Sequence, residues 1–525
     1  LAFGMQAKDA LLNGVEQLSQ AVGITMGPGG QNVVIECEGQ IPILTKDGVT
    51  VAGAVNLTDE FENLGVQLVK EAAQSTAETA GDGTTTATVL AHAFFKNGLQ
   101  AVNAGHNPVE VRRGMKAAAE DISGQIRKWS KPIKNFHEIS QIGTISANGE
   151  KEIGDYLTQA MQAVGQDGVI TVEDAKGFET RLEKVDGTRL NRGFLSPYFI
   201  NNDARNCCFL ENPYVLLTNK KISHIQELVP ILEQVHQKQR SILVIADDVE
   251  GEALNALVVN ATQGIMKICC IKAPEFGQAR IGVMSDLSLL LGAKIVNTGD
   301  DEGLAKLTLD DLGNCSNITT TRGETIIVCD QVDQNLLEER CEEIRNQLSK
   351  PGVGLNEKAV LQRRLARLAG GVAILRVGGS TEAELRERKD RVEDALHATR
   401  AAVNGGILPG GGTALLRASH MVHPEQDSSV DFVMGYNIIK RSCEEPIRRI
   451  TTNSGMVADI VIEKVLMKKS VNYGFDAREQ KYQDLFKAGV IDPTLVVLNA
   501  LKHATSAADN LLSIGCAMIT EKNKI

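Results

Sequence analysis

The sequence predicts a multidomain α/β protein whose two chain ends together form a helical base. A chain of 525 residues is too long for one ordinary hydrophobic core, so about three domains are expected. Both ends carry apolar residues at helical spacing and a glycine-rich loop, whereas residues 186–372 contain short β-branched runs that alternate with helices. If both loops serve one ligand, the α/β middle portion must be inserted between two halves of the base.

Three helices are expected near the N-terminus. The first ends at residues 27–30 (GPGG), which are themselves a candidate phosphate loop, and the second leads into a Gly-Asp-Gly corner where the third begins. The apolar positions that define them are Leu11, Val15, Leu18 and Val22; then Phe61, Leu64, Leu68 and Ala72; then Val89, Leu90 and Phe94.

The pattern of apolar residues along the sequence changes twice after these helices. Residues 241–246 (SILVIA) and 267–271 are expected to form strands separated by a helix, which is typical of an α/β domain. From residue 405 onward long helical patterns return, and they open with residues 409–412 (PGGG) before the apolar run 413–416.

Composition excludes several classes of protein. The net charge of −11 argues against binding to nucleic acid, and no apolar run approaches the length of a membrane span. The ten cysteines include two adjacent pairs, at 207–208 and 269–270, but no Cys-x-x-Cys pair and no zinc-like spacing with histidine. We therefore expect reduced packing cysteines in a reducing compartment. The chain begins at Leu1 without a signal segment, so we expect it to be processed or trimmed.

The corner at residues 80–90 (AGDGTTTATVL) is the most informative stretch. Gly81 and Gly83 allow the main chain to approach a ligand, and the first amides of the following helix are unpaired. Asp82 could then hold Mg²⁺, which usually takes one or two carboxylates together with the phosphates of its substrate. For an isolated Gly-Asp-Gly, an ordinary helix cap is the more common explanation. No Walker loop, Rossmann fingerprint, zinc-protease motif or nucleophile elbow occurs in the sequence.

Further segments carry a family resemblance. They are TKDGVTV at 45–51, ISAN at 145–148, LSPYFIN at 195–201, DVEGEAL at 248–254, VEDALHATRAAV at 392–403 and IDPT at 491–494. Together with residues 27–28 and the Gly-Asp-Gly corner, they resemble group I chaperonins of the GroEL type over nearly the whole chain. In this context the metal and phosphate explanation of Asp82 is favoured over a cap.

The resemblance implies three domains and an assembly. It implies an all-α equatorial ATPase domain from residues 1–128 and 405–525, a small α/β intermediate hinge domain from 129–185 and 373–404, and an α/β apical domain at 186–372 that binds non-native polypeptides. It also implies homo-oligomeric rings of seven subunits, one or two rings, and closure of a folding chamber by a GroES-type co-chaperonin.

The resemblance also implies the ligand and its contacts. ATP and Mg²⁺ are expected, and a potassium ion is also compatible with the family. The nucleotide-binding residues carried over are Thr25, Met26, Gly27, Pro28, Lys46, Asp82, Gly83, Thr84, Thr85, Thr86, Gly411, Asp476, Ala477, Arg478 and Asp492, with Asp82 as the metal ligand. Among them, Asp476 to Arg478 lie near the base and Asp492 near the ribose.

Two further carboxylates match the catalytic positions of the family. Asp47 is expected near the terminal phosphate, and Asp394 is expected to reach the attacking water when the hinge domain closes. The alternative for Asp394 is a solvated helix face, because residues 382–391 contain eight charged side chains.

The expected polypeptide-binding face is apolar. Its residues by resemblance are Phe194, Tyr198, Phe199, Val229, Leu232, Leu254, Val258 and Val259. Residues 222–235 independently predict a helix that is apolar around more of its circumference than one buried stripe requires. Core packing is the alternative for each of these side chains.

Several positions depart from the family pattern. Gly29 replaces a common lysine, Asp476 replaces a common asparagine, and Met456 and Val457 replace an acidic pair at the ring-to-ring contact, which leaves single and double rings open. The chain ends at Ile525 without the usual Gly-Gly-Met tail. An ATP-driven folding machine is favoured over a passive holdase ring and over an unrelated ATPase or phosphotransferase. The bacterial cytoplasm and an organelle matrix are both compatible with the sequence.

Overall fold

The computed structural model describes residues 1–36, 42–147, 149–165, 168–175, 177–202, 205–297, 303–329, 332–349 and 355–519. Asn148 of the ISAN segment and the residues after 519 lie outside these ranges. The chain divides into two compact units. The first unit comprises Leu1–Gln159, Asp174–Thr180 and Val377–Ile525, and the second comprises Ala160–Glu173 and Arg181–Arg376. The division of the first unit into an equatorial and a hinge domain stays a prediction.

Helices dominate the first unit. Its longer helices are α1 (Gly4–Gly23), α3 (Glu60–Ala80), α4 (Thr84–Asn103), α5 (Pro108–Trp129), α13 (Glu382–Gly405), α15 (Val430–Ser442) and α19 (Thr494–Ser513). Its shorter helices are α2 (Gly48–Ala54), α6 (Phe136–Ser146), α14 (Thr413–Met421), α16 (Glu445–Asn453), α17 (Ala458–Met467) and α18 (Leu485–Ala488), and α7 (Lys151–Val164) begins in this unit.

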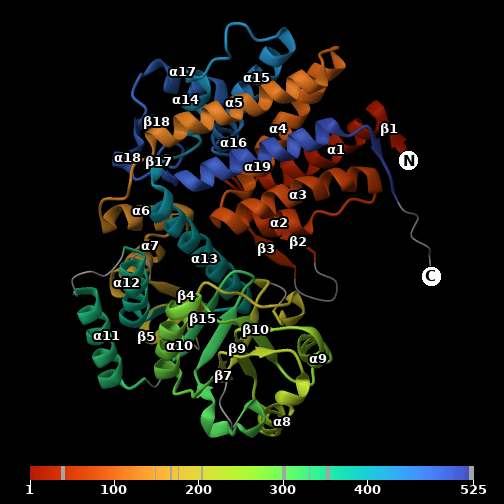
Figure 1. The fold of residues 1–525 in the computed structure, drawn as a ribbon. Helices are drawn as coiled ribbons and strands as arrows, with labels where there is room; N and C mark the ends of the chain where they lie inside the picture. The colour runs from red at the N-terminus through yellow and green to blue at the C-terminus, as the bar shows by residue number, and fades with distance from the viewer. Residues whose placement is uncertain are drawn as a thin grey trace. The chain divides into compact units, whose positions relative to one another are not determined.

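The core of the first unit is built from both ends of the chain. Helix α19 packs against α3, α4 and α5, so the C-terminal helix completes a bundle that the N-terminal helices begin (Figure 1). The predicted apolar repeat of α1 is confirmed, because Leu11, Val15, Leu18 and Val22 are all buried in this core. In α3 the buried stripe is displaced from the predicted one. Val66 and Val69 are fully buried whereas Leu64 and Leu68 are partly exposed, because α3 contacts α1, α4 and α19 together.

The prediction that this base is entirely helical is corrected by four small strand pairs. They are β1 (Ala2–Phe3) with β21 (Cys516–Ala517), β2 (Val33–Ile35) with β3 (Ile43–Thr45), β17 (Ile407–Pro409) with β20 (Ile491–Pro493), and β18 (Tyr473–Asp476) with β19 (Lys481–Asp484). The β17–β20 pair matters for function. It places Leu408 opposite Asp492 and so joins the glycine loop at 409–412 to the IDPT segment.

The second unit combines two larger sheets, one two-stranded sheet and covering helices. Its strands are β4 (Val169–Asp174), β5 (Arg181–Leu190), β6 (Cys208–Glu211), β7 (Tyr214–Thr218), β8 (Lys221–Ile222), β9 (Ile242–Ala246), β10 (Asp248–Val249), β11 (Ile268–Lys272), β12 (Ile295–Val296), β13 (Gly313–Asn314), β14 (Asn317–Thr320), β15 (Thr325–Cys329) and β16 (Val372–Val377). Its helices are α8 (Val229–Gln237), α9 (Gly251–Thr262), α10 (Gly277–Leu291), α11 (Gln334–Ser349) and α12 (Leu355–Gly370).

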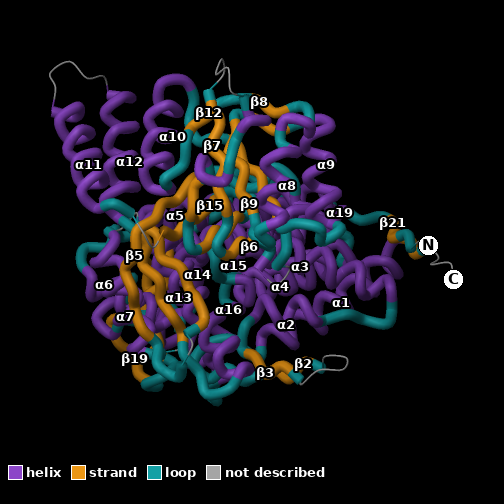
Figure 2. Tube along the Cα trace, turned by 90° about the horizontal axis from the view of Figure 1, so that it is seen from below, coloured by secondary structure: helices purple, strands orange, loops and turns teal. Residues whose placement is uncertain are grey.

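The two larger sheets of this unit have different patterns of pairing, and β8 pairs in parallel with β10 in a separate sheet. Strands β11, β9, β7 and β12 are parallel in that order, and β13 adds antiparallel to β7. The other sheet has the order β4-β16-β5-β15-β14-β6, in which the pairs from β16 to β6 are antiparallel. Figure 2 shows that the strands concentrate in this unit. Every residue of β9 is buried, as expected for a parallel strand covered on both faces, so the strand predicted at 241–246 is confirmed.

The prediction of one helix over residues 222–235 is wrong. Ile222 ends strand β8, Ile225–Glu227 form a single 3₁₀ turn, and α8 begins only at Val229. The unusual apolar content has a physical reason. Ile222, Leu228 and Ile231 are all fully buried, because three different elements insert their side chains into the same core.

The cysteines pack as expected. All nine described cysteines are free thiols, and eight of them are buried. Burial raises the pKa of the Cys269 and Cys270 thiols, which disfavours the reactive thiolate. Among the described residues, no helix has both the length and the apolar character needed to cross a bilayer.

Candidate nucleotide site

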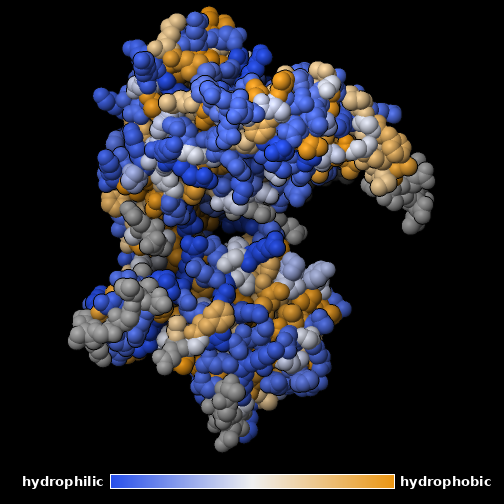
Figure 3. Space-filling model, turned by 45° about the horizontal axis from the view of Figure 1, so that its top comes forward, coloured by the Kyte–Doolittle hydropathy of each residue, from blue (hydrophilic) through white to orange (hydrophobic). Residues whose placement is uncertain are grey.

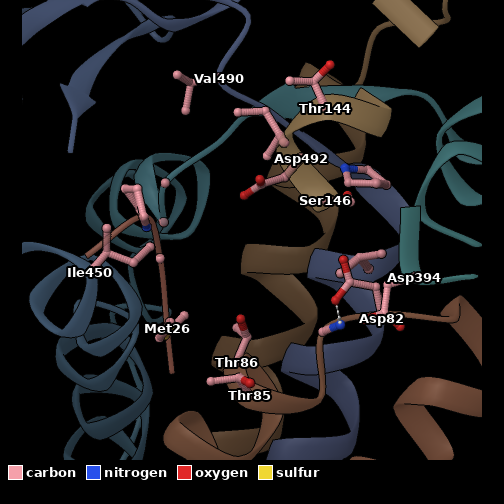
Figure 4. Close-up of a pocket in the computed structure, with 18 of the residues that line it drawn as sticks. Met26, Asp82, Thr85, Thr86, Thr144, Ser146, Asp394, Ile450, Val490 and Asp492 are labelled. Carbon is pink, nitrogen blue, oxygen red and sulfur yellow. Dashed lines mark hydrogen bonds between the residues drawn. The ribbon is translucent and has the colours of Figure 1, made fainter. Parts of the chain in front are cut away.

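A cavity of about 590 Å³ lies within the first unit. This volume falls in the range of pockets that hold small molecules and cofactors. The structure brings all the predicted nucleotide-site and catalytic residues to its wall, namely Thr25, Met26, Gly27, Pro28, Lys46, Asp47, Asp82, Gly83, Thr84, Thr85, Thr86, Asp394, Gly411, Asp476, Ala477, Arg478 and Asp492. The wall therefore combines segments from both ends of the chain, as the two-loop hypothesis requires. The side chains of Asp82, Asp394 and Asp492 project into the same space (Figure 4).

The Gly-Asp-Gly corner leaves the start of α4 open. Gly81 ends α3 with φ 71° and Gly83 precedes α4 with φ 93°, both in the left-handed region that favours glycine. No side chain caps α4. The carboxylate of Asp82 accepts a hydrogen bond from the backbone N–H of Gly83, drawn dashed in Figure 4, and not from an amide of the helix. The capping explanation of Asp82 is therefore wrong, and the first amides of α4 remain available to an anion.

A second open helix start faces the same cavity. Helix α14 follows Gly412, which has φ 75°, and again no side chain caps the helix. Gly411, Gly412 and Leu415 line the cavity beside it. Because the start of a helix carries partial positive charge and unpaired N–H groups, two such ends make the cavity suited to a polyanion.

The loop after α1 is fixed against α16. The Nδ2 atom of Asn453 donates hydrogen bonds of 2.9 Å to the carbonyl oxygens of Gly23 and Met26. The close packing of the loop against α16 also explains why glycine stands at position 29, where the family commonly has lysine. A Cβ at Gly29 would lie 2.5 Å from the backbone carbonyl oxygen of Asn453. Glycine at position 29 thus allows α16 to hold the loop from Thr25 to Pro28 against the cavity.

Several carboxylates line this cavity, and those of Asp82, Asp394 and Asp492 have raised pKa values. Burial raises the pKa of Asp82, partly offset by its bond to the Gly83 amide, and the charge of Asp47 raises it further. Burial and then the charges of Asp47 and Asp82 raise the pKa of Asp394 well above its ordinary value. Burial, with Asp82 adding to it, raises the pKa of Asp492 to about 7. Burial and mutual repulsion oppose the ionisation of these carboxyl groups. A cation bound beside them would stabilise their negatively charged forms.

Asp47 and Asp394 are held in different ways. Asp47 caps α2, because its carboxylate accepts bonds of 3.0 Å from the Val49 amide and 2.7 Å from the Thr50 amide. Its role is therefore partly structural, which sequence reasoning missed. Asp394 is half-buried on α13 and lines the cavity, so the solvated-face explanation is wrong for it. The charged residues before it mislead because part of the charged face of α13 lines the cavity, where Glu387, Asp390 and Arg391 accompany Asp394.

Asp476 lines the cavity but its carboxylate is engaged elsewhere. One oxygen accepts bonds from the amides of Arg478 at 3.0 Å and Glu479 at 3.1 Å, and the other accepts from Gln483 Nε2 at 2.9 Å. The side chain thus stabilises the β18–β19 turn. The prediction that Asp476, Ala477 and Arg478 lie near the base stays a prediction, and all three line the cavity.

Several lining residues were not predicted from the sequence. Helix α6 contributes His137, Ser140, Gln141 and Thr144, and the apolar part of the wall includes Ile450 and Val490. The four α6 residues recur at positions i, i+3, i+4 and i+7, so the polar face of this helix was a usable signal.

The site fits Mg²⁺ only if phosphates complete its coordination. Within the described parts of the chain, no three histidine, cysteine, aspartate or glutamate side chains are arranged to hold a metal ion. A single carboxylate, Asp82, beside an open helix start is the donor set that Mg²⁺ uses with a nucleotide, because the ion keeps several waters and takes oxygens from phosphate.

The predicted polypeptide-binding residues lie in the second unit with unequal exposure. Tyr198 is 67% exposed, Val259 48% and Val229 38%. Phe194, Leu232, Leu254 and Val258 are partly buried against the core. Phe199 is only 2% exposed, so its predicted contact with a polypeptide is corrected: the 3₁₀ turn Pro197–Phe199 points this ring into the core. Exposed apolar side chains occur among polar ones on the visible face of the molecule (Figure 3).

The chain belongs to the TCP-1/cpn60 chaperonin family, because the model of that family matches residues 18–522. This membership supports a chaperone role. Among solved structures, the fold is similar to that of the chaperonin gp146 from the bacteriophage EL 2 (Pseudomonas aeruginosa), crystallised in the presence of ATP-BeFx. Crystal form II gives a TM-score of 0.70 and crystal form I gives 0.64, each at 22% identity and covering 99% of both chains. At this identity the likeness shows the fold alone.

Proposed function

We propose that this protein is an ATP-dependent chaperonin of the group I, GroEL-like type, which captures non-native polypeptides and promotes their folding. One observation carries the proposal. Two uncapped helix starts, those of α4 and α14, face one cavity together with Asp82, and the two helices come from opposite ends of the chain. The phosphate oxygens of a triphosphate would accept hydrogen bonds from the unpaired amides of these helix starts, and Mg²⁺ would offset their repulsion from the carboxylates. The neighbour gp146 was crystallised with an ATP analogue, which supports the same ligand class.

The residues of this cavity have distinct tasks. The amides of Thr84 to Thr86 would donate to phosphate oxygens, and the loop from Thr25 to Pro28 would follow the nucleotide on the other side. Bound Mg²⁺, held by Asp82 and the phosphates, would neutralise charge on the triphosphate. Asp47, fixed as the cap of α2, would hold its negative charge at a set place near the terminal phosphate.

Asp394 is proposed to orient the attacking water. Phosphoryl transfer depends mainly on positioning and on stabilising charge, so one oriented carboxylate can control the rate. Asp394 is carried on α13, whereas Asp82 belongs to the corner between α3 and α4. Movement of α13 relative to that corner would therefore couple hydrolysis to conformation.

Client capture is proposed at the exposed side chains of Tyr198, Val229 and Val259. Burying a few hundred Å² of apolar surface gives on the order of 10 kcal/mol at ~25 cal/mol/Å², and association costs offset most of this. One subunit alone would bind clients weakly. Repetition of the site in a ring raises the effective concentration, which is a physical reason for an oligomer.

The assembly and its surroundings are part of the proposal. Rings of seven subunits, in one or two layers, would be closed by a GroES-type co-chaperonin. Potassium is proposed as an additional ion, and the bacterial cytoplasm or an organelle matrix as the compartment. Family membership supports the ring, and the free buried cysteines suit a reducing compartment.

Two variants of the cavity test the nucleotide site. Asp82→Ala is expected to weaken the binding of ATP with Mg²⁺, measured by titration calorimetry. Asp394→Ala is expected to bind ATP as the parent does and to hydrolyse it slower by orders of magnitude. Equal hydrolysis rates for Asp394→Ala and the parent would refute the assignment.

A passive holdase ring is the second candidate, because the exposed apolar residues of the second unit would serve it without hydrolysis. Recovery of a denatured client separates the two functions. The folding machine requires ATP and co-chaperonin for recovery, whereas the holdase suppresses aggregation equally without them. Light scattering on the same samples reports the particle size.

A further inference from the structure

Two segments of the first unit that are far apart in the sequence meet at the rim of the cavity. Arg478 lies in the turn between β18 and β19, and it is both exposed to solvent and part of the cavity wall. Gly149 lies in the segment between α6 and α7, and Ser146 and Lys151 on either side of it line the cavity. The rim is therefore formed in part by the turn around Arg478 and by the segment around Gly149.

The guanidinium group of Arg478 lies directly against the main chain of Gly149. A Cβ added to Gly149 would have Nη1, Nη2 and Cζ of Arg478 as its three nearest atoms, and it would overlap all of them. Only glycine leaves room for this contact, and its φ of 89° lies in the left-handed region that favours glycine. A guanidinium group suits the contact, because it is planar and carries its donors along the edge.

Both sides of this contact are anchored. On one side, the Asp476 carboxylate accepts hydrogen bonds from the amides of Arg478 at 3.0 Å and Glu479 at 3.1 Å, which fixes the turn. On the other side, the Gly149 amide donates a hydrogen bond of 2.7 Å to the carbonyl oxygen of Thr144, which fixes the segment to α6. The side chain of Arg478 thus spans two fixed parts of the rim.

A bridge at this place restrains the passage of a ligand in both directions. The contact joins protein to protein and includes no atom of a ligand, so it hinders entry and release alike. Closing elements of this kind commonly control the release of products from enzymes. A bridge that is closed for about nine-tenths of the time slows both steps about ten-fold, because only the open fraction exchanges ligand.

We propose, on the basis of the nucleotide site proposed above, that Arg478 forms a strap across the rim that slows the entry and release of nucleotide. The strap is the contact of its guanidinium group with the backbone of Gly149. Helix α7 begins at Lys151, close after Gly149, and runs from the first unit into the second. A movement of the second unit that shifts α7 would open the strap and so couple nucleotide exchange to conformation.

The test measures the binding kinetics of a fluorescent ADP analogue with Mg²⁺ on the full-length protein by stopped flow. Arg478→Ala removes the strap and is expected to raise both the association and the dissociation rate constant by about ten-fold. Gly149→Ala is expected to raise both by a similar factor, because the added Cβ takes the place of the guanidinium group. The double variant should exchange no faster than either single variant, since both substitutions remove one contact.

Two further variants control the experiment. Gly105→Ala places alanine at a φ of 97° where nothing lies within 4 Å of the added Cβ, so it should keep the parental rates. Arg478→Lys keeps the positive charge but loses the planar group, and it is expected to exchange nucleotide as fast as Arg478→Ala.

Several results would overturn the strap and leave the nucleotide site in place. They are parental rates in Arg478→Ala, a rise in the dissociation rate alone, which indicates a direct contact with the nucleotide, and parental rates in Arg478→Lys, which indicate attraction by charge. Additive effects of Arg478→Ala and Gly149→Ala would also overturn it. A parent that does not bind the analogue in the presence of Mg²⁺ removes the nucleotide site itself, and the strap with it.

Discussion

Replacing Gly81 by alanine tests whether the corner and α13 are packed tightly enough to control catalysis. Gly81 has φ 71°, and a Cβ there would lie 2.2 Å from the Cβ of His397 on α13. The Cβ of His397 cannot rotate away, because it is attached directly to the backbone. The contact is therefore relieved only if the corner and α13 separate. Asp82 follows Gly81 and Asp394 lies three residues before His397, so the two carboxylates would separate as well.

The magnitude follows from two contributions. A left-handed φ costs alanine about 1 kcal/mol, and forced overpacking costs about 1–3 kcal/mol. Gly105 provides the matched control, because its φ of 97° is also left-handed but nothing lies within 4 Å of its added Cβ. Gly105→Ala is thus expected to lose about 1 kcal/mol and Gly81→Ala about 3 kcal/mol of the free energy of unfolding.

The assays are urea unfolding and ATP hydrolysis on both variants. Because a displacement of about 1 Å in reacting groups can cost about a hundred-fold in rate, Gly81→Ala is expected to lower kcat by at least ten-fold, while Gly105→Ala keeps the parental kcat. The reasoning is refuted if Gly81→Ala has the same free energy of unfolding as Gly105→Ala and hydrolyses ATP at the parental rate. The close packing of the corner against α13 would then have no part in the reaction.

Three other perturbations separate roles that coincide in the structure. Asp47→Asn keeps a good cap for α2, so it should slow hydrolysis and leave the free energy of unfolding unchanged. Asp47→Ala should slow hydrolysis and also lower the free energy of unfolding by about 1 kcal/mol. Loss of stability in both variants would contradict this. Val259→Ser should impair capture of unfolded protein with ATPase activity intact, whereas Leu336→Ser, also half-exposed, should not; equal aggregation suppression by both would count against the binding face. Burial raises the pKa of Asp492 from 3.8 to about 7, so the unfolded chain loses this proton at a lower pH than the folded protein does. The folded state therefore loses stability as the pH rises between these two values, and it stays destabilised at higher pH. Asp492→Asn should therefore raise the unfolding temperature of the nucleotide-free protein more at pH 8 than at pH 4, and an equal shift at both values would rule this out.

Much of the fold follows from local pattern. The repeat of Leu11, Val15, Leu18 and Val22 predicted a buried helix because only one helical face can carry that spacing, and the structure has α1 there. The segment at 222–235 failed for a related reason. A run of apolar residues reports burial but not backbone geometry, and here a strand, a 3₁₀ turn and a helix share one core.

The candidate site was predictable as a set of residues but not as a set of roles. The glycine corner and loop motifs identified the wall of the cavity, because glycine and unpaired helix amides have few other uses together. The engagement of Asp476 within its hairpin and of Asp47 as a cap depends on which donor each carboxylate meets in the folded chain. The polar face of α6 was overlooked for the same reason. The spacing of its residues predicts that they share one side of a helix, but it does not predict that this side lines the cavity.

The sequence by itself determined that this protein has a helical base with two glycine loops, an α/β insertion and the motifs of a chaperonin. Local spacing and residue chemistry are sufficient for that, because they limit which backbone geometries and ligands are accessible. Only the tertiary structure decided that Asp394 turns inward, that Phe199 is buried and that α4 and α14 open onto one cavity. Those facts depend on contacts between residues hundreds of positions apart, which no local pattern encodes.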